Sequence, residues 1–382
     1  MIREFVQQRL QWRPPLIWVA SLVLSVSWQG VVLAGLPERH VENREHAMGV
    51  AESTECGVSE SESQEWFESG RRISASAVAV LRRRLKSNGW DRHARFVVVA
   101  YCFWHRTEAR ELSIEGADLS AWWLTRCPGS ILPGLGEFLR VVPEYGPENG
   151  KMWRAVVEKQ PTNAKILDLA AQAFMMSDSA YAIELTTRAR KVSPAEMRLA
   201  LHLAELYALK SEDGKQTQND ALTAYRLYLE ASSMAGAKQL RLEYAPAAAR
   251  CALRAGLLDD ARRLGQRMVA EAPTVKGRWD YGNLIHHGNN ILGVVALRSG
   301  RMKVAIAYLD KAGETPGSPQ LGSFGPSMGL ARELLVRGER DAVLGYLESC
   351  GKFWKKHRGR LEEWKKTIRA GEMPDFGVNL RY

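Results

Sequence analysis

The stretch NAKILDLAAQAFMMSDSAYAIELTTRARKVSPAE, residues 163–196, decides the fold. Its apolar residues recur at intervals of three or four in two short runs, which is the spacing of amphipathic helices. A polar Ser-Asp-Ser at 177–179 separates the runs, and Pro194 closes the unit twelve residues after Ala182. The pattern predicts two helices joined by a tight turn.

The same pattern returns four times along the chain. Further copies span 242–275 and 286–317, and a weaker copy spans 328–350. A further copy begins near Leu203 and is interrupted by the insertion KSEDGKQTQND. The equivalent small residues of the second helices are Ala182, Ala221, Ala261, Ala305 and Val343, which lie 39, 40, 44 and 38 residues apart. This spacing indicates a unit of about 34 residues with small insertions.

The small residues have a physical reason. A bulky side chain where two helices cross would push their axes beyond the usual contact distance of about 8–10 Å. Gly256, Gly300 and Gly338 stand between the two helices of their copies, where we expect the turns. Because one hairpin cannot bury both of its faces, we expect the copies to stack into a solenoid.

This pattern resembles the tetratricopeptide repeat (TPR) family over about residues 163–350. The small-residue pairs of the first helix match at Leu169-Ala170, Leu203-Ala204, Leu292-Gly293 and Leu330-Ala331, and the closing proline matches at Pro194, at Pro273 and approximately at Pro316. The family's tryptophan in the first helix is absent from every copy. The resemblance implies an all-α, right-handed helical-repeat solenoid of paired antiparallel helices. The chain is also similar to uncharacterised bacterial proteins of this type, which implies no known reaction.

The N-terminus predicts export. Residues 1–13 carry three arginines and one acid, and residues 14–37 carry no charge. Val-Leu-Ala before Gly35 fits a signal-peptide cleavage site, and the apolar run is also about long enough to cross a bilayer once. We expect a signal peptide or an N-terminal membrane anchor over 1–36, which would place the protein outside the cytoplasm, in the periplasm or envelope. A mis-assigned start codon or a buried core helix is the alternative.

Composition divides the remaining chain. A polar, Glu- and Ser-rich segment, too poor in large aliphatics to fold, predicts a disordered linker. The helical patterns before the repeats are less regular than the repeats themselves. The expected parts are therefore a linker over 37–65, an irregular helical part over 66–160, repeats over 161–350, a basic capping helix over 351–370 and a tail over 371–382.

The segment GPSMG, Gly325 to Gly329, fits the Gly-x-Ser-x-Gly pattern of serine hydrolases, with Ser327 as the nucleophile. That pattern needs a buried strand before it, but the preceding TPGSPQLGSF is rich in proline and glycine. The only histidine after it is His357. We therefore expect Ser327 to be the N-cap of a helix, and a hydrolase is the weak alternative.

The candidate binding residues lie on the first helices of the repeats, which line the concave side in this family. They are Arg250, Arg254, His287, Asn290, Arg298 and Arg332. Arginine grips a carboxylate through two parallel hydrogen bonds, so we expect a groove for a protein segment of acidic character. The alternative is that the arginines pair with neighbouring acids such as Glu243 or Glu333. The family's Lys and Asn pair that clamps a terminal carboxylate is missing.

The net charge, the basic C-terminal segment and the cysteines give only general indications of function. The chain has 53 Lys and Arg against 43 Asp and Glu, a net charge of +10, which favours acidic partners. A basic C-terminal segment with Phe353, Trp354 and Trp364 predicts a solenoid cap; a cytoplasmic nucleic-acid-associated protein is the alternative. The five cysteines form no CxxC pair. We expect buried thiols, with a Cys102–Cys127 disulfide as the alternative, and no cofactor or metal.

Overall fold

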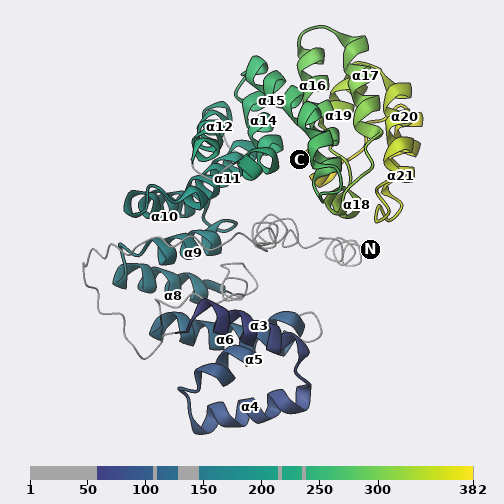
Figure 1. The fold of residues 1–382 in the computed structure, drawn as a ribbon. Coiled ribbons are helices and arrows are strands. Elements are labelled where there is room, and N and C mark those ends of the chain that lie inside the picture. Colours follow the sequence, from purple (N-terminus) through teal and green to yellow (C-terminus); the bar gives the residue numbers. More distant parts are fainter. Residues whose placement is uncertain (1–57, 106–109, 128–145, 214–216, 235–237, 382) are drawn as a thin grey trace, which may run out of the picture. The chain divides into compact units, whose positions relative to one another are not determined.

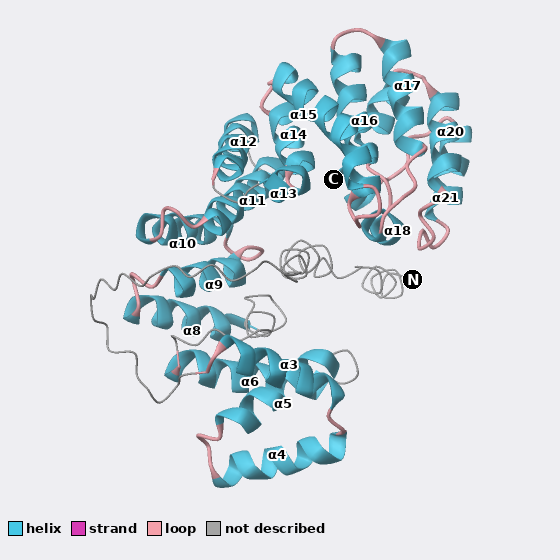
Figure 2. Ribbon diagram, in the orientation of Figure 1, coloured by secondary structure: helices cyan, strands magenta, loops and turns pink. Residues whose placement is uncertain are grey.

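The computed structural model describes residues 58–105, 110–127, 146–213, 217–234 and 238–381. The predicted signal or anchor over 1–36 lies outside these residues. Everything regular in the described part is helical, and Figure 2 shows no strand there. Within the same residues, no helix combines the length and the apolar character that a membrane span requires.

The N-terminal helices pack around an aromatic core that includes buried Phe96 and Trp123. The helices are α3 (Glu60–Arg72), α4 (Ala75–Ser87), α5 (Arg92–His105) and α6 (Arg110–Arg126). Helix α8 (Gly146–Lys159) packs in the next cluster, with the first hairpin of the repeats. Helix α5 contacts α3, α4 and α6. Helix α3 begins inside the segment expected to be linker, because Ser59 and Glu62 form a capping box at its start.

Five consecutive helical hairpins follow, which confirms the all-α repeat fold (Figure 1). The pairs are α9 (Ala164–Phe174) with α10 (Ser179–Val192), α11 (Met197–Asp213) with α12 (Thr217–Ser233), α14 (Ala245–Arg254) with α15 (Leu258–Glu271), α16 (Tyr281–Arg298) with α17 (Met302–Gly313), and α19 (Gly329–Val336) with α20 (Arg340–Cys350). Three short helices connect them: α13 (Lys238–Glu243), η1 (Ala272–Val275) and α18 (Pro319–Phe324). Each hairpin contacts the next, and the first helices α11, α14, α16 and α19 also contact one another in turn.

The small residues found in the sequence lie where the helices cross. All five, Ala182, Ala221, Ala261, Ala305 and Val343, are completely buried. A Cβ added to Gly293 on α16 would stand 2.2 Å from Leu330 Cδ2 on α19, so the buried Leu330 side chain would have to move to admit any larger residue. The turn glycines Gly256, Gly300 and Gly338 have φ values of +79°, +73° and +88°, a conformation that glycine adopts without strain.

The insertion KSEDGKQTQND does not separate its hairpin as the sequence suggested. Helix α11 continues through Asp213, and α12 begins at Thr217. Lys210 Nζ lies 3.2 Å from Asp220 Oδ1, so an ion pair joins the ends of the two helices. Most of the insertion therefore lengthens the helices, and this hairpin is made of two 17-residue helices.

The C-terminal part covers the last hairpin with α21 (Arg360–Arg369) and η2 (Gly377–Leu380). As expected, Trp354 and Trp364 are buried, whereas Lys355 and Lys356 are exposed. The capping helix begins later than residue 351, because Arg358 and Gly359 both have positive φ. The tail is also packed, with Phe376 and Asn379 buried.

Three of the cysteines are buried thiols, as expected, but the disulfide of the structure is not the one that the sequence suggested. Cys102, Cys251 and Cys350 are buried free thiols, and burial is the largest cause that raises the pKa of each. Cys127 is disulfide-bonded. Because Cys102 is a free thiol, the alternative Cys102–Cys127 pairing is wrong.

Candidate functional site

Two of the predicted arginines stand side by side on α14. Arg254 donates to Glu212 Oε1 on α11 over 2.7 Å, so it takes the ion-paired alternative, with an acid other than those expected. Arg250 is half-buried and makes no hydrogen bond or ion pair with the described residues. Burial, and next the charge of Arg254, lower the pKa of Arg250. The charge of Glu212 opposes this shift, but Glu212 forms its ion pair with Arg254 and not with Arg250.

The other two arginines lie further along the repeats. Arg298 at the end of α16 donates to the carbonyl oxygen of Leu253 over 2.9 Å and to Glu333 Oε1 over 3.3 Å. Pairing with Glu333 was the alternative expected from the sequence. Arg332 on α19 is exposed and makes no ion pair with the described residues. Of the four predicted arginines, Arg250 and Arg332 keep a guanidinium free of such a pair.

His287 and Asn290 do not lie on a ligand-facing surface, contrary to the sequence prediction. Both side chains are at least nine-tenths buried. Helix α16 is contacted by α14, α15, α17, α18 and α19, so its polar side chains point into packed structure. Asn290 Nδ2 donates to the carbonyl oxygen of His286 over 3.0 Å, and the ring of His287 packs edge-on against the ring of His286.

His286 is the centre of a polar network in the interior. Its Nδ1–H donates to the carbonyl oxygen of Ala312 over 3.0 Å, and its Nε2 accepts the backbone N–H of Ser327 over 2.9 Å. Burial lowers the pKa of His286 to about 4, so the ring is neutral near pH 7. Tyr346 donates to the carbonyl oxygen of Ser327 over 2.8 Å. The network ties the loop before α19 to α16, α17 and α20.

This network explains the GPSMG segment. Ser327 uses its backbone to hold the loop, and the N-cap of α19 is Met328, which makes no side-chain capping bond. The expectation that Ser327 is the N-cap is therefore wrong. Asn379 of the tail donates to the carbonyl oxygens of Phe324 and Pro326 and accepts the N–H of Met328. Both ring nitrogens of His286 are engaged by backbone groups, so the segment serves packing.

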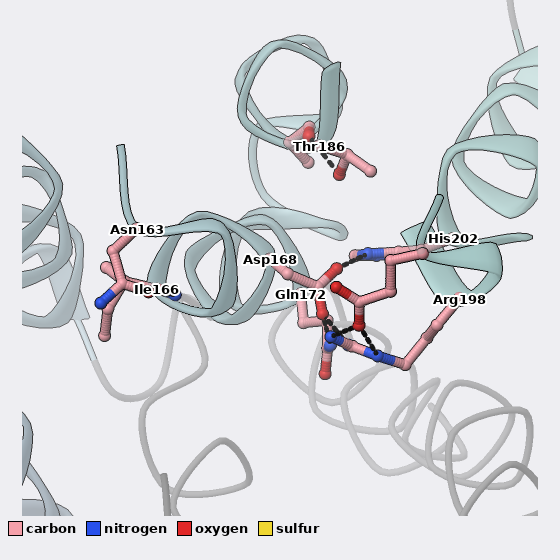
Figure 3. A network of polar contacts seen from close by, with 9 residues as sticks. Asn163, Ile166, Asp168, Gln172, Thr186, Arg198 and His202 are labelled. Atoms are coloured by element: carbon pink, nitrogen blue, oxygen red, sulfur yellow. Dashed lines mark hydrogen bonds and ion pairs between the residues drawn. The ribbon is translucent and has the colours of Figure 1, made fainter. Parts of the chain in front are cut away.

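A second polar network, shown in Figure 3, lies between α9 and α11. Asp168 is only 1% exposed, and its Oδ1 accepts from His202 Nδ1 over 2.6 Å. Its Oδ2 accepts from Gln172 over 2.9 Å and from Arg198, which is itself half exposed. The two networks have a buried histidine in common, but here the partner is a carboxylate.

The carboxylate changes how this histidine titrates. Burial alone would raise the pKa of Asp168, but the charge and hydrogen bond of His202, with those of Arg198, outweigh it and lower the pKa. Burial alone would lower the pKa of His202, but Asp168 outweighs it and raises the pKa. The pair is therefore stabilised as an imidazolium and a carboxylate. His202 Nε2 is buried and has no hydrogen-bond partner.

Glu205 lies three residues after His202, on the same side of α11. Its side chain is partly buried and makes no hydrogen bond or ion pair with the described residues. Burial, together with the charges of Asp168 and Glu243, raises the pKa of Glu205 to about 7, although His202 opposes the shift. A carboxyl group with such a pKa and no partner is the kind of group that marks functional sites.

Two tyrosines, buried Tyr228 and partly buried Tyr244, lie near Glu205, and Tyr228 also lies near Arg250. The rings of Tyr228 and Tyr244 stack with centroids 6.0 Å apart and an interplanar angle of 29°. The charge of Glu205 acts on both phenols, and the charge of Arg250 acts on Tyr228. We call the following six residues the polar strip: Asp168, His202, Glu205, Tyr228, Tyr244 and Arg250.

Of the polar strip, only Arg250 was predicted from the sequence as a site residue. Arg198, His202 and Glu205 are spaced four and three residues apart, which places them on one face of a helix. That spacing was a readable signal. The partnership of His202 with Asp168, 34 residues earlier, needs the stacking of two hairpins. Among the described residues, no group of three or more His, Cys, Asp or Glu side chains is arranged to hold a metal ion.

Comparison with known proteins adds a structural likeness. No family model matches the chain, and no curated protein matches it. Among solved structures, the crystal structure of yeast Tom70 matches with a TM-score of 0.42 and 12% sequence identity. The match covers 81% of this chain and 65% of the Tom70 chain. The repeat fold stands on the hairpins and contacts described above.

Proposed function

We propose that this protein is a non-enzymatic scaffold or adaptor that holds a segment of a protein partner in a concave groove lined by the first helices of its repeats. Arg250 is the observation that carries the proposal. It is a half-buried guanidinium on α14, without an ion pair among the described residues. A partner with acidic character would supply the missing carboxylate.

The physical basis is the cost of an uncompensated charge. A charge withdrawn from water is unfavourable unless an opposite charge and hydrogen bonds replace the solvent. Burial and the neighbouring charge of Arg254 both act against the charged form of Arg250. A carboxylate that forms two parallel hydrogen bonds with the guanidinium would relieve this cost and fix its own orientation. Arg332 on α19 offers a second, exposed guanidinium to the same partner.

The experiment is crosslinked capture from membrane and soluble fractions, followed by mass spectrometry. It compares the wild type with Arg250→Glu and with Arg226→Glu, a control on α12. Arg226 is exposed and makes no ion pair with the described residues, so both variants change the net charge equally. We expect the wild type and the control to capture the same protein through an Asp- or Glu-containing segment, and Arg250→Glu to lose it. Identical partners for all three proteins, or nucleic acid in place of protein, would contradict the proposal.

We also propose that the repeats work outside the cytoplasm, in the bacterial envelope, after export or while anchored by the N-terminal segment. The proposal comes from the charge pattern of residues 1–37. The disulfide at Cys127 supports it, because disulfides persist in oxidising compartments. N-terminal sequencing of the protein purified from its native host tests cleavage, and protease treatment of intact cells and spheroplasts tests exposure. Protection of the repeats in spheroplasts would contradict export.

A further inference from the structure

Glu205 and Arg250 carry opposite charges on the first helices of two successive hairpins. Helix α11 holds Glu205, helix α14 holds Arg250, and the two helices are in contact. Both side chains are partly buried, and neither forms a hydrogen bond or an ion pair with the described residues. Other charged residues find a partner across this same kind of contact, as Arg254 does with Glu212 and Arg298 with Glu333.

The two stacked tyrosines explain why the charges coexist without meeting. Tyr228 is 4% exposed and feels the charges of both Glu205 and Arg250, so its phenol stands near each of them. Tyr244 is near Glu205 and packs on Tyr228. The tyrosine pair therefore lies near two opposite charges, neither of which forms an ion pair with a described residue.

The ionisable neighbours of Glu205 act on it in opposite directions. His202, one helical turn earlier, uses its Nδ1–H for Asp168, and its charge lowers the pKa of Glu205 without a hydrogen bond between them. Glu243 on α13 adds a like charge. Buried polar groups in folded proteins are paired in the great majority of cases. Glu205 and Arg250 are only partly buried and have no such partner among the described residues, so both are available to a ligand.

We propose that Glu205 and Arg250 are the two poles of one binding site, and that the bound protein segment carries a basic side chain close to an acidic one. The ammonium or guanidinium of the segment pairs with Glu205, and its carboxylate pairs with Arg250. The aliphatic part between them packs on the ring of Tyr244, which is partly exposed. This inference rests on the proposed function and narrows the partner's chemistry from acidic to mixed charge.

Glu205 also makes the site discriminate against purely acidic segments. A segment with acidic residues alone would bring a carboxylate towards Glu205 and Glu243, and like charges brought together at an interface oppose binding. Arg250 alone would accept any such segment. The net charge of +10 attracts acidic partners in general, so a feature that rejects purely acidic segments gives the site its specificity.

The test is selection from a library of short random peptides, carried out on the full chain as wild type, Glu205→Gln and Arg250→Gln. We expect the wild type to select peptides enriched in both basic and acidic residues. Glu205→Gln should lose the basic enrichment and keep the acidic one, and Arg250→Gln should do the opposite. For one selected peptide, we expect replacement of its basic residue by Gln to weaken wild-type binding about tenfold and to leave binding by Glu205→Gln nearly unchanged.

The outcomes separate this inference from the proposed function. Acidic enrichment without basic enrichment in the wild-type selection would overturn the second pole, while the adaptor role would stand. Absence of acidic enrichment, unchanged by Arg250→Gln, would overturn the adaptor site itself. The wild-type selection decides the inference even if a variant folds poorly, and circular dichroism of both variants checks their folding.

Discussion

Two buried histidines on first helices, His286 and His202, show the difference between a polar group that builds the fold and one that belongs to a site. His286 is neutral near pH 7, because burial lowers its pKa to about 4, and backbone groups engage both of its ring nitrogens. His202 has a raised pKa, because Asp168 outweighs its burial, and its Nε2 has no partner.

The neighbours of the two histidines differ in the same way. Around His286, the loop before α19 is fixed by bonds from Tyr346 and Asn379. Around His202, the helix continues to Glu205, which has no hydrogen bond with any described residue. Burial alone does not distinguish the two regions. Accounting for the partners of each polar group does, and the region with missing partners is the one we assign to binding.

The largest expected effect is that of His286→Ala. The variant leaves the N–H of Ser327 and the carbonyl of Ala312 without their partners and opens a cavity. We expect a loss of about 3–5 kcal/mol in the free energy of unfolding, measured by urea unfolding followed by circular dichroism. Ser327→Ala is the matched control, because Ser327 contributes its backbone; we expect a loss below about 1 kcal/mol. A larger loss for Ser327→Ala than for His286→Ala would show that the Ser327 side chain, and not His286, holds the loop.

Asp168→Asn should lower the free energy of unfolding by less than His286→Ala does, by about 2–3 kcal/mol, because it leaves His202 buried without its carboxylate. The loss depends on pH. The lowered pKa of Asp168 gives a contribution that is lost as pH falls below about 3.9, and the raised pKa of His202 gives one that is lost as pH rises beyond about 6.5. The loss of stability should therefore be greatest near pH 5–6. A loss that does not vary between acidic and alkaline pH would show that His202 is not charged.

Glu205→Gln should increase the free energy of unfolding, whereas the two previous substitutions decrease it. The pKa of Glu205 is raised to about 7, so the folded protein holds a proton that the unfolded chain releases from about pH 4.5 upward. Wild-type stability therefore falls between these values, and the variant escapes this loss. We expect a gain of about 1–2 kcal/mol at pH 8 and little change at pH 4, both from urea unfolding. A loss of stability at pH 8 would reveal a partner for Glu205 inside the protein.

Arg254→Gln should have the smallest effect on stability, a loss of about 1 kcal/mol, because its ion pair with Glu212 remains in contact with solvent. High salt should reduce the difference between the variant and the wild type, since screening weakens such a pair. The loss is measured by urea unfolding at low and high salt. A loss as large as that of Asp168→Asn would mean that this pair, too, is fully withdrawn from water.

The repeat fold was predictable because its signals are local and periodic. The spacing of Ala182, Ala221 and Ala261 fixes where the helices cross, and Gly256 and Gly300 fix the turns. The start of α3 also has a local sequence signal, the capping box of Ser59 and Glu62, but the polar composition around it favoured a linker. The later start of the capping helix was not readable, because Arg358 adopts a positive φ that its residue type does not favour.

The candidate site was predictable only in part, because partners come from other hairpins. Arg254 pairs with Glu212, 42 residues earlier, and no local pattern joins them. His287 and Asn290 were placed on a surface, because the sequence does not show that six other helices, η1 among them, contact α16. Arg250 was found from its position on a first helix. Its missing partner became apparent only from the structure.

The most direct test of the account measures stability and capture on one variant, Arg250→Gln. An unneutralised charge contributes nothing to the fold, so we predict an unchanged or slightly higher midpoint of urea unfolding. The same variant should lose the protein that the wild type captures by crosslinking. A lower midpoint together with unchanged capture would show that Arg250 belongs to the fold, like His286, and would contradict the account.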